Sequence, residues 1–482
     1  MRRLAIIGAL SACLLGGAPF AAMADEKTEK ALDERIKRLE KMVEELTKHE
    51  RKEAREEAKE KGKEKEKPAE AKASEQPLGF GSTGSGKLIY AKPFVSAPKT
   101  TVGGYMDFQY RAFKNSSIDN DITINGSRVG TSSTFDQTRF VPFFYSDVTD
   151  RLKVAAELEI EHGIRSKSND GSGIEVSLEF ATIDYLIAEP INFRAGILLL
   201  PVGKFNLLHD SPLNDLTDRP LVSTFIIPST MSEGGAGFYG TFYPSRLSKL
   251  DYELYVAQGP NGYRNDGTAR ISEGAGLRNS RHRVSTADDG LDNNNGKAVV
   301  GRVAFSPMLG IEVGGSGYYG KYDPFNKRSL SIMAVDWTLQ RGPFEVIGEA
   351  AWAYAKSNSQ DLNGDASFED ARADGSTPLR AQRMGGFYVQ ANYHFMPEAL
   401  KRWAPTHFKD SSTFTGVLRW DDINTNRDAV GGPRDIQRLT MGLNFRPVED
   451  TVFKVDYQFN FENGRANRIN NDGLLLSVAT YF

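Results

Sequence analysis

The sequence predicts an all-β fold, a 16-stranded antiparallel transmembrane β-barrel with an N-terminal periplasmic coiled-coil helix. Three observations lead to this fold class: an export signal, apolar–polar alternation from about residue 101 onward, and links that are alternately short and long. The 482 residues have a mean hydropathy of −0.44, and no run of about 20 apolar residues follows the signal. A chain without such a run crosses a membrane only as a closed barrel, because lipid cannot satisfy open backbone groups.

Residues 1–24 are typical of a secretory signal peptide. Arg2 and Arg3 precede an apolar run over residues 4–15, and Ala-Met-Ala at 22–24 suits a cleavage site. The alternative is a lipoprotein box ending at Cys13, which we disfavour because the apolar stretch continues to the later site. Cleavage after residue 24 removes the only cysteine and so excludes disulfides and cysteine metal sites.

Residues 25–50 carry an apolar stripe with a 4-3-4-3 spacing, which predicts a coiled-coil segment. An amphipathic helix lying on its own barrel is the alternative, but the stripe is narrow and favours self-association. About two heptads are too short to be stable alone. The predicted core positions are Leu32, Ile36, Leu39, Val43 and Leu46.

Residues 51–100 read as a linker. The stretch to residue 77 is rich in Lys and Glu and has no large apolar residue, so it cannot bury a core. Pro68 and Pro77 end any helix, and a Gly/Ser stretch over 79–86 leads into the barrel domain, residues 101–482.

Within 101–482, segments such as 152–161, 387–395 and 453–461 alternate apolar and polar residues. In a membrane barrel the apolar face meets lipid and the polar face a wet lumen, although a soluble sandwich also alternates. The lengths of the links distinguish a membrane barrel from a soluble sandwich. About sixteen strands are joined alternately by short links, such as 188–191 and 341–343, and by long polar ones, as in bacterial barrels. One expected short turn, 396–411, is long and contains a predicted helix at 398–403.

The strand at 474–482 alternates and has Phe482 at its end. This aromatic resembles the signal by which the barrel assembly machinery recognises its substrates. We therefore expect the barrel to lie in the outer membrane of a Gram-negative cell, among its lipids and lipopolysaccharide, with the N-terminal segment in the periplasm.

The runs FDQTRFVPFF, DRLKVAAELEIEHG, NFRAGILLLPVGKFN and HDSPLNDLTDRPLVSTFIIPSTMSEGGAGFYG, all within residues 135–242, resemble the phosphate-selective porin O/P family. The likeness is weaker toward the C-terminus, where FKVDYQFN fits. It implies a homotrimeric sixteen-stranded porin that forms a water-filled channel for passive diffusion of small hydrophilic solutes and ions. Anion or phosphate selectivity is the alternative, and a barrel that tethers the envelope is a further one.

Residues 201–234 form the third long loop, which in sixteen-stranded porins folds into the barrel and narrows it. The loop carries many aliphatic residues, which favour an inserted position over an exposed one. The apolar set is Leu207, Leu208, Leu213, Leu216, Leu221, Phe225, Ile226 and Ile227. The ionisable residues predicted to line the pore constriction are Lys204, His209, Asp210, Asp215, Asp218, Arg219 and Glu233.

Alternation also assigns charged residues of both signs to the lumen wall. Because the loop is not basic and the wall is mixed, the sequence predicts weak or absent phosphate preference. The predicted wall residues include Arg111, Lys153, Glu157, Glu159, Arg194, Arg419, Arg438 and Lys454.

The sequence favours no enzymatic function, because neither G-x-S-x-G nor H-E-x-x-H occurs and carboxylates two apart on a strand are same-face lumen charges. The chain has six histidines, and its one cysteine is lost with the predicted signal peptide, so the sequence predicts no metal site and no cofactor. A formal charge of −3 argues against a nucleic-acid partner.

Overall fold

The computed structural model describes residues 99–114, 123–124, 127–128, 132–163, 175–260, 262, 270–271, 276–280, 296–323, 326–356, 383–427, 435–463 and 471–482. The predicted signal peptide, the coiled-coil positions Leu32, Ile36, Leu39, Val43 and Leu46, and the linker lie outside the described residues, as do most of the loops at 261–296 and 357–381.

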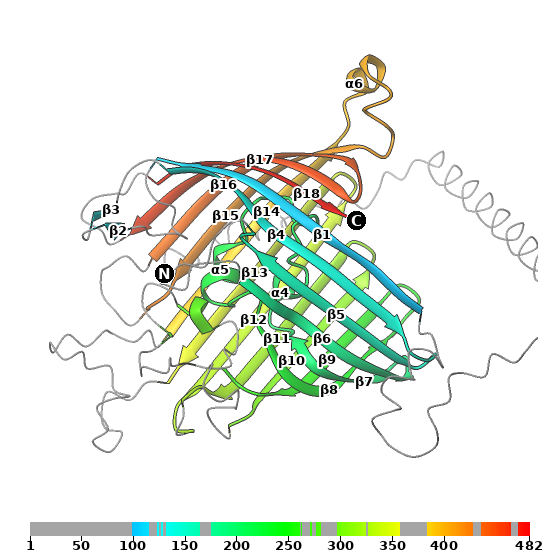
Figure 1. The fold of residues 1–482 in the computed structure, drawn as a ribbon, viewed down its shortest axis with the longest axis vertical. Coiled ribbons are helices and arrows are strands. Elements are labelled where there is room, and N and C mark those ends of the chain that lie inside the picture. Colours follow the sequence, from blue (N-terminus) through cyan, green and yellow to red (C-terminus); the bar gives the residue numbers. More distant parts are fainter. Residues whose placement is uncertain are drawn as a thin grey trace, which may run out of the picture. The chain divides into compact units, whose positions relative to one another are not determined.

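Sixteen antiparallel strands form one closed barrel, as the sequence predicts (Figure 1). Each strand pairs with its neighbours in the chain, and β1 closes the ring by pairing with both β4 and β18. A separate two-stranded sheet contains β2 (Thr123–Ile124) and β3 (Ser127–Arg128). The barrel strands are β1 (Lys99–Phe113), β4 (Ser132–Asp147), β5 (Leu152–Glu161), β6 (Glu175–Ala188), β7 (Ile191–Leu199), β8 (Ser232–Phe242), β9 (Lys249–Ala257), β10 (Ala298–Met308), β11 (Ile311–Lys321), β12 (Ser329–Arg341), β13 (Phe344–Ala355), β14 (Arg383–Phe395), β15 (Thr413–Asn424), β16 (Asp435–Val448), β17 (Thr451–Asn463) and β18 (Gly473–Tyr481).

The seam of the barrel is closed by backbone hydrogen bonds at Phe482. The amide of Phe482 donates to the carbonyl of Gly104 over 2.9 Å, and the amide of Gly104 donates back over 3.1 Å. The Phe482 ring stacks on Phe140 with ring centroids 5.8 Å apart. Because β1 and β18 pair along nine residues, the sheet has no open edge at the seam.

The links have the predicted asymmetry. At one end of the barrel, two-residue turns join β6 to β7, β10 to β11, β12 to β13 and β16 to β17. The other end carries the long links, including 200–231 and 258–297. The exceptional link at 396–412 does contain the predicted helix, α6 (Glu398–Trp403), which projects away from the barrel wall (Figure 1). Pro397 occupies the N-cap position, and Lys401 and Arg402 occupy the last turn, where cations suit the helix dipole.

The wall has the opposite polarity to a soluble protein. On its outer face, Val303, Val335 and Val455 are 49%, 42% and 51% exposed. On its inner face, Asp421 and Gln458 are fully buried. Period-2 alternation along each strand separates these two sets, and only a bilayer solvates the apolar one without cost.

Aromatic side chains gather near both ends of the outer face. Phe242, Phe344 and Tyr393 lie close to the short turns, and Phe344 and Tyr393 have ring centroids 5.0 Å apart. Tyr319 and Tyr354 lie close to the long links. Such paired belts mark the two interfaces of a membrane-spanning barrel, with the aliphatic band between them.

Within the described residues, no helix is long and apolar enough to span a membrane.

The link between β7 and β8 folds into the barrel, as predicted. It contains two short helices, α4 (Lys204–Leu207) and α5 (Leu221–Phe225), and α5 contacts β13, β14 and β15 (Figure 1). Of the predicted apolar set, Leu208 and Leu213 are about half exposed, at 48% and 50%, and Leu207 is partly buried. The fully buried members are Leu216, Leu221, Phe225, Ile226 and Ile227.

The buried loop side chains pack on an apolar part of the inner wall. There the inward positions are small or aliphatic, so alternation disappears locally and the wall accepts the loop. Burial of each large aliphatic side chain contributes about 1.5–3 kcal/mol, which holds the loop inside. The wall residues of this cluster include Ala298, Val300, Ile332, Ala334, Ala351 and Ala353.

Substitution of the outer face tests whether it contacts lipid. Val303 lies mid-strand on β10, so we expect Val303→Arg to lower the free energy of unfolding from lipid vesicles by about 2–4 kcal/mol. Leu309→Arg in the adjacent two-residue turn is the control and should cost about 0–1 kcal/mol. If urea titrations show equal stability for the two variants, the outer face is not in a bilayer.

Candidate functional site: the loop-lined pore constriction

The neck of the inserted loop is tied by Asn206. Its side-chain amide donates to the Leu200 carbonyl over 2.7 Å, and its side-chain oxygen accepts from the Met231 amide over 2.9 Å. The Leu200 amide also donates to the Met231 carbonyl over 3.0 Å. The two ends of the loop are therefore held together where it leaves the wall.

The Glu349 carboxylate on β13 accepts hydrogen bonds from both helices of the loop. The Phe205 amide donates to its Oε2 over 3.1 Å, and the Ser223 hydroxyl donates to its Oε1 over 3.1 Å. Gly203 precedes α4 with φ of 72°, and a Cβ there would collide with the Glu349 carboxylate. Glycine is therefore required at this close approach.

Five cations from the wall hold the far side of the loop, and we call them the basic clamp: Arg111, Arg419, Arg438, Arg446 and Lys454. Three of them donate to loop carbonyls. Arg446 Nη1 donates to Pro212 over 2.7 Å, Lys454 Nζ to Ser211 over 2.7 Å, and Arg419 Nη1 to Asp218 over 3.0 Å. The loop is thereby fixed to β15, β16 and β17, across the lumen from its own strands.

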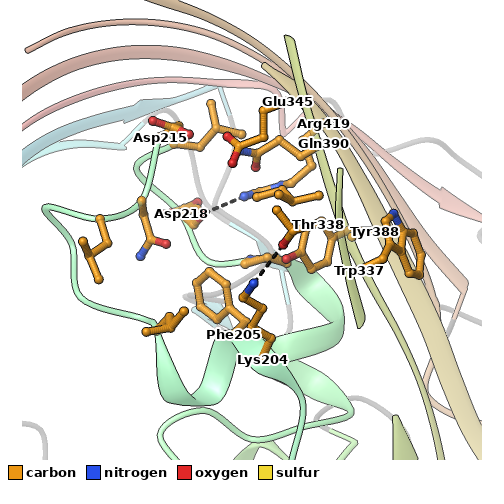
Figure 2. A pocket seen from close by; sticks show the side chains of 17 residues that line it. Lys204, Phe205, Asp215, Asp218, Trp337, Thr338, Glu345, Tyr388, Gln390 and Arg419 are labelled. Atoms are coloured by element: carbon orange, nitrogen blue, oxygen red, sulfur yellow. Dashed lines mark hydrogen bonds between the residues drawn. The ribbon is translucent and has the colours of Figure 1, made fainter. Parts of the chain in front are cut away.

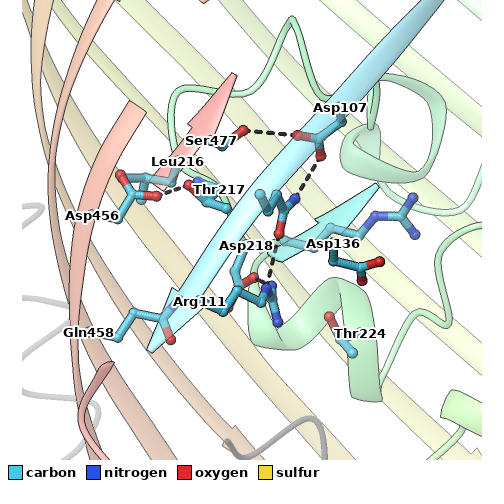
Figure 3. Close-up of polar contacts among 12 residues, drawn as sticks. Asp107, Arg111, Asp136, Leu216, Thr217, Asp218, Thr224, Asp456, Gln458 and Ser477 are labelled. Atoms are coloured by element: carbon cyan, nitrogen blue, oxygen red, sulfur yellow. Dashed lines mark hydrogen bonds and ion pairs between the residues drawn. The ribbon is translucent and has the colours of Figure 1, made fainter. Parts of the chain in front are cut away.

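Asp218 completes the clamp (Figure 3). It forms an ion pair with Arg111 on β1, and Gln458 Nε2 donates to it over 2.7 Å. Arg438 Nη1 lies 3.7 Å from the same carboxylate. The neighbouring Thr217 amide donates to Asp456 over 2.5 Å.

Asp215 makes a second set of contacts. Asn392 Nδ2 donates to it over 2.8 Å and Asn444 Nδ2 over 3.1 Å, while Arg446 Nη2 lies 3.4 Å away. The loop acids Asp215 and Asp218 are thus each paired with wall cations, so they do not stand as uncompensated negative charges.

A cavity of about 260 Å³ remains between loop and wall (Figure 2). Apolar side chains of the loop line one part of it, and polar and charged side chains line the rest. The lining includes Lys204, Phe205, Leu208, Asp215, Trp337, Glu345, Tyr388, Gln390 and Arg419.

The two loop cations differ in position. Lys204 lines the cavity and is 27% exposed, and its Nζ contacts Thr338 Oγ1 at 2.8 Å and Glu312 Oε1 at 2.9 Å. Arg219 is directed elsewhere: its Nη1 donates to the Ser229 carbonyl over 2.8 Å, and its Nε and Nη2 are buried. Arg219 therefore packs within the loop and does not line this cavity.

The remaining residues predicted for the constriction lie in other contacts. His209 is buried with its Nε2 2.5 Å from Glu179 Oε1, and Asp210 accepts from the Tyr481 hydroxyl over 2.8 Å. Glu233 is not part of the loop. It belongs to β8, because strand pairing resumes at Ser232, and it accepts from the Tyr318 hydroxyl over 2.7 Å.

Four of the predicted wall residues contact the inserted loop: Arg111, Arg419, Arg438 and Lys454. Three others pair instead with residues of the wall. Arg194 pairs with Asp184 at 2.8 Å, and Lys153 pairs with Asp147 at 2.8 Å near the short turns. Glu159 pairs at 3.1 Å with Arg139, which the sequence prediction missed. Glu157 is also buried in this part of the wall, close to Glu179.

Arg446 and Asn444 were also missed, although the signal was present. They continue the inward period-2 series of β16 that contains Arg438 and Thr440. The β16 alternation extends as far as Arg446, whereas Arg139 follows an irregularity in the pairing of β1 and β4 that shifts the phase.

No family model matches the chain. An uncharacterized protein of Aquifex aeolicus (strain VF5) is 27% identical over 372 residues, which cover 74% of each chain.

Three solved structures are among those similar to this chain. The outer membrane channel DcaP of Acinetobacter baumannii is 13% identical, with a TM-score of 0.48 over 80% of this chain and 97% of that chain. OmpF of Salmonella typhi, in complex with daunomycin, is 13% identical, with a TM-score of 0.49 over 80% and 98%. An anion-selective porin from Comamonas acidovorans is 11% identical, with a TM-score of 0.47 over 80% and 100%.

By its own strand order, the chain is a closed sixteen-stranded antiparallel β-barrel with an inserted loop, which is the architecture of a porin. Membership of the phosphate-selective porin O/P family stays a prediction.

Proposed function

We propose that this chain is an outer-membrane porin, a water-filled channel for the passive diffusion of small hydrophilic solutes and ions. The observation that carries the proposal is the inverted polarity of a closed wall: Val303 and Val455 point outward while Asp421 and Gln458 are buried inside. An apolar exterior belongs in lipid, and a polar interior belongs around water. The outer membrane is where such single-chain bacterial barrels occur.

The contacts at the constriction favour weak ion selectivity. The loop acids Asp215 and Asp218 are offset by wall cations, and Lys204 is offset by Glu312. Selective pores carry rings of one sign, and this constriction has none among the residues described. Phosphate selectivity is the alternative, but three cations of the basic clamp donate to loop carbonyls, which occupies them with the protein's own acceptors.

Planar-bilayer recording tests the pore and its selectivity together. The wild-type chain should give discrete conductance steps and a small reversal potential in asymmetric KCl. Lys204→Gln removes the nearer cation of Glu312 and leaves it with Arg302 Nη2 at 3.8 Å, so permeability should shift about twofold toward K⁺. Lys153→Gln, near the short turns and away from the loop, is the matched control and should leave the reversal potential unchanged.

Absence of steps from folded protein would overturn the porin proposal. Steps that saturate with phosphate at low concentration would instead support the phosphate-selective alternative.

We also propose that the barrel forms a homotrimer and that the segment with Leu32, Ile36 and Leu39 adds to the assembly from the periplasm. About two heptads cannot drive assembly alone, so the barrel contact is the stronger one. Deletion of residues 25–76 should therefore leave a heat-modifiable barrel that is still trimeric in native mass spectrometry. Monomers would show that the N-terminal segment is the main interface, and an envelope-tethering role would then gain support.

A further inference from the structure

Three ligand-type side chains converge where the inserted loop meets the wall. Glu157 comes from β5, Glu179 from β6 and His209 from the loop just after α4. One ligand atom from each lies within 4.8 Å of the others. The three residues are only 4%, 0% and 2% exposed.

The imidazole of His209 is oriented as a ligand. Its Nδ1 lies 3.0 Å from the Asn206 carbonyl, which can only accept, so Nδ1 carries a proton and donates. Nε2 is thereby turned toward the two carboxylates, 2.5 Å from Glu179 Oε1. A backbone carbonyl on Nδ1 is the usual outer contact of a histidine that binds metal through Nε2.

The carboxylates leave oxygen atoms without donors. Among the residues that the structure describes, Glu157 Oε1 and Glu179 Oε2 are buried and have no hydrogen-bond partner. Arg139 on the adjacent strand is directed to Glu159 and Glu161, at 3.1 and 3.0 Å. Burying two adjacent carboxylates demands compensating positive charge. The imidazolium supplies at most a single unit, and the nearby Arg219 guanidinium, which acts on Glu179 electrostatically, donates its Nη1 to the Ser229 carbonyl.

We propose that Glu157, Glu179 and His209 bind one divalent transition-metal ion of the zinc class. Two carboxylates and one imidazole suit Zn²⁺, whereas Ca²⁺ and Mg²⁺ prefer oxygen ligands alone. The direct contact between His209 and Glu179 is then replaced by bonds of both residues to the ion. Such an ion ties the loop to β5 and β6, at a point separate from the basic clamp, and goes beyond the proposed channel activity.

Metal analysis of the full chain tests the site. The protein carries a tag without histidine, is stripped with EDTA in detergent, equilibrated with Zn²⁺ and desalted. We expect about one Zn²⁺ per wild-type chain, a content that Glu157→Gln or His209→Gln abolishes. The matched controls are Glu345→Gln and His394→Gln. This His–Glu pair lies 3.5 Å apart and, among the residues that the structure describes, has no third acid or histidine close enough to share an ion, so both variants should retain the ion.

Two further measurements separate loss of metal binding from loss of folding. Heat-modifiable migration in SDS gels reports folding of each variant. Cobalt-loaded wild-type protein should show visible ligand-field absorption. Zn²⁺ added to the metal-free wild-type protein should raise the unfolding temperature of that protein. The proposal is overturned if folded wild-type protein binds neither Zn²⁺ nor Co²⁺, or if folded His209→Gln binds Zn²⁺ as the wild type does. The cluster is then an ion pair with a shared proton.

Discussion

The closed hydrogen-bonded ring of strands is the constraint on which the rest of the structure depends. A bilayer offers no partner for a backbone amide, so β1 must pair with β18 as well as with β4. Closure fixes one face of each strand toward lipid and the other toward the lumen. The apolar exterior, the aromatic belts and the polar interior all follow from this single requirement.

The interior is divided between two kinds of packing. On one side, α5 and the residues after it fill the barrel against small side chains such as Ala334 and Ala351, and water is excluded. On the other, the basic clamp holds the loop through carbonyls and the carboxylate of Asp218. Buried ion pairs add little to the free energy of unfolding, because the loss of hydration opposes the attraction between the charges. Removing one partner is nevertheless destabilising, because it leaves the other charge buried without compensation. The apolar cluster therefore stabilises the inserted loop, and the clamp fixes its position against β15, β16 and β17.

Period-2 patterning was enough to predict the strands, and the lengths of the links gave their two classes. The helix at Glu398–Trp403 was predicted inside the one link that was longer than expected. It also predicted that Arg419 and Arg438 point inward, because alternation assigns the face of a residue. Alternation does not say how deep in the barrel a side chain lies or which residue it contacts. In these two respects the observed site differs from the predicted one. Arg219 lies in the predicted loop, yet its guanidinium turns to the Ser229 carbonyl, and Glu233 belongs to β8. The path of a non-periodic loop depends on tertiary contacts, which a local pattern does not encode.

The position of the loop across the lumen is the central claim, and cysteine cross-linking tests it most directly. Leu216 packs against Gly442 on β16, so Leu216→Cys paired with Gly442→Cys, with Cys13 replaced by Ser, should be joined by a short bismaleimide in intact outer membranes. The cross-linked channel should keep its conductance, because the loop already lies against that wall. Absence of a cross-link, or a conductance lost when it forms, would contradict the account.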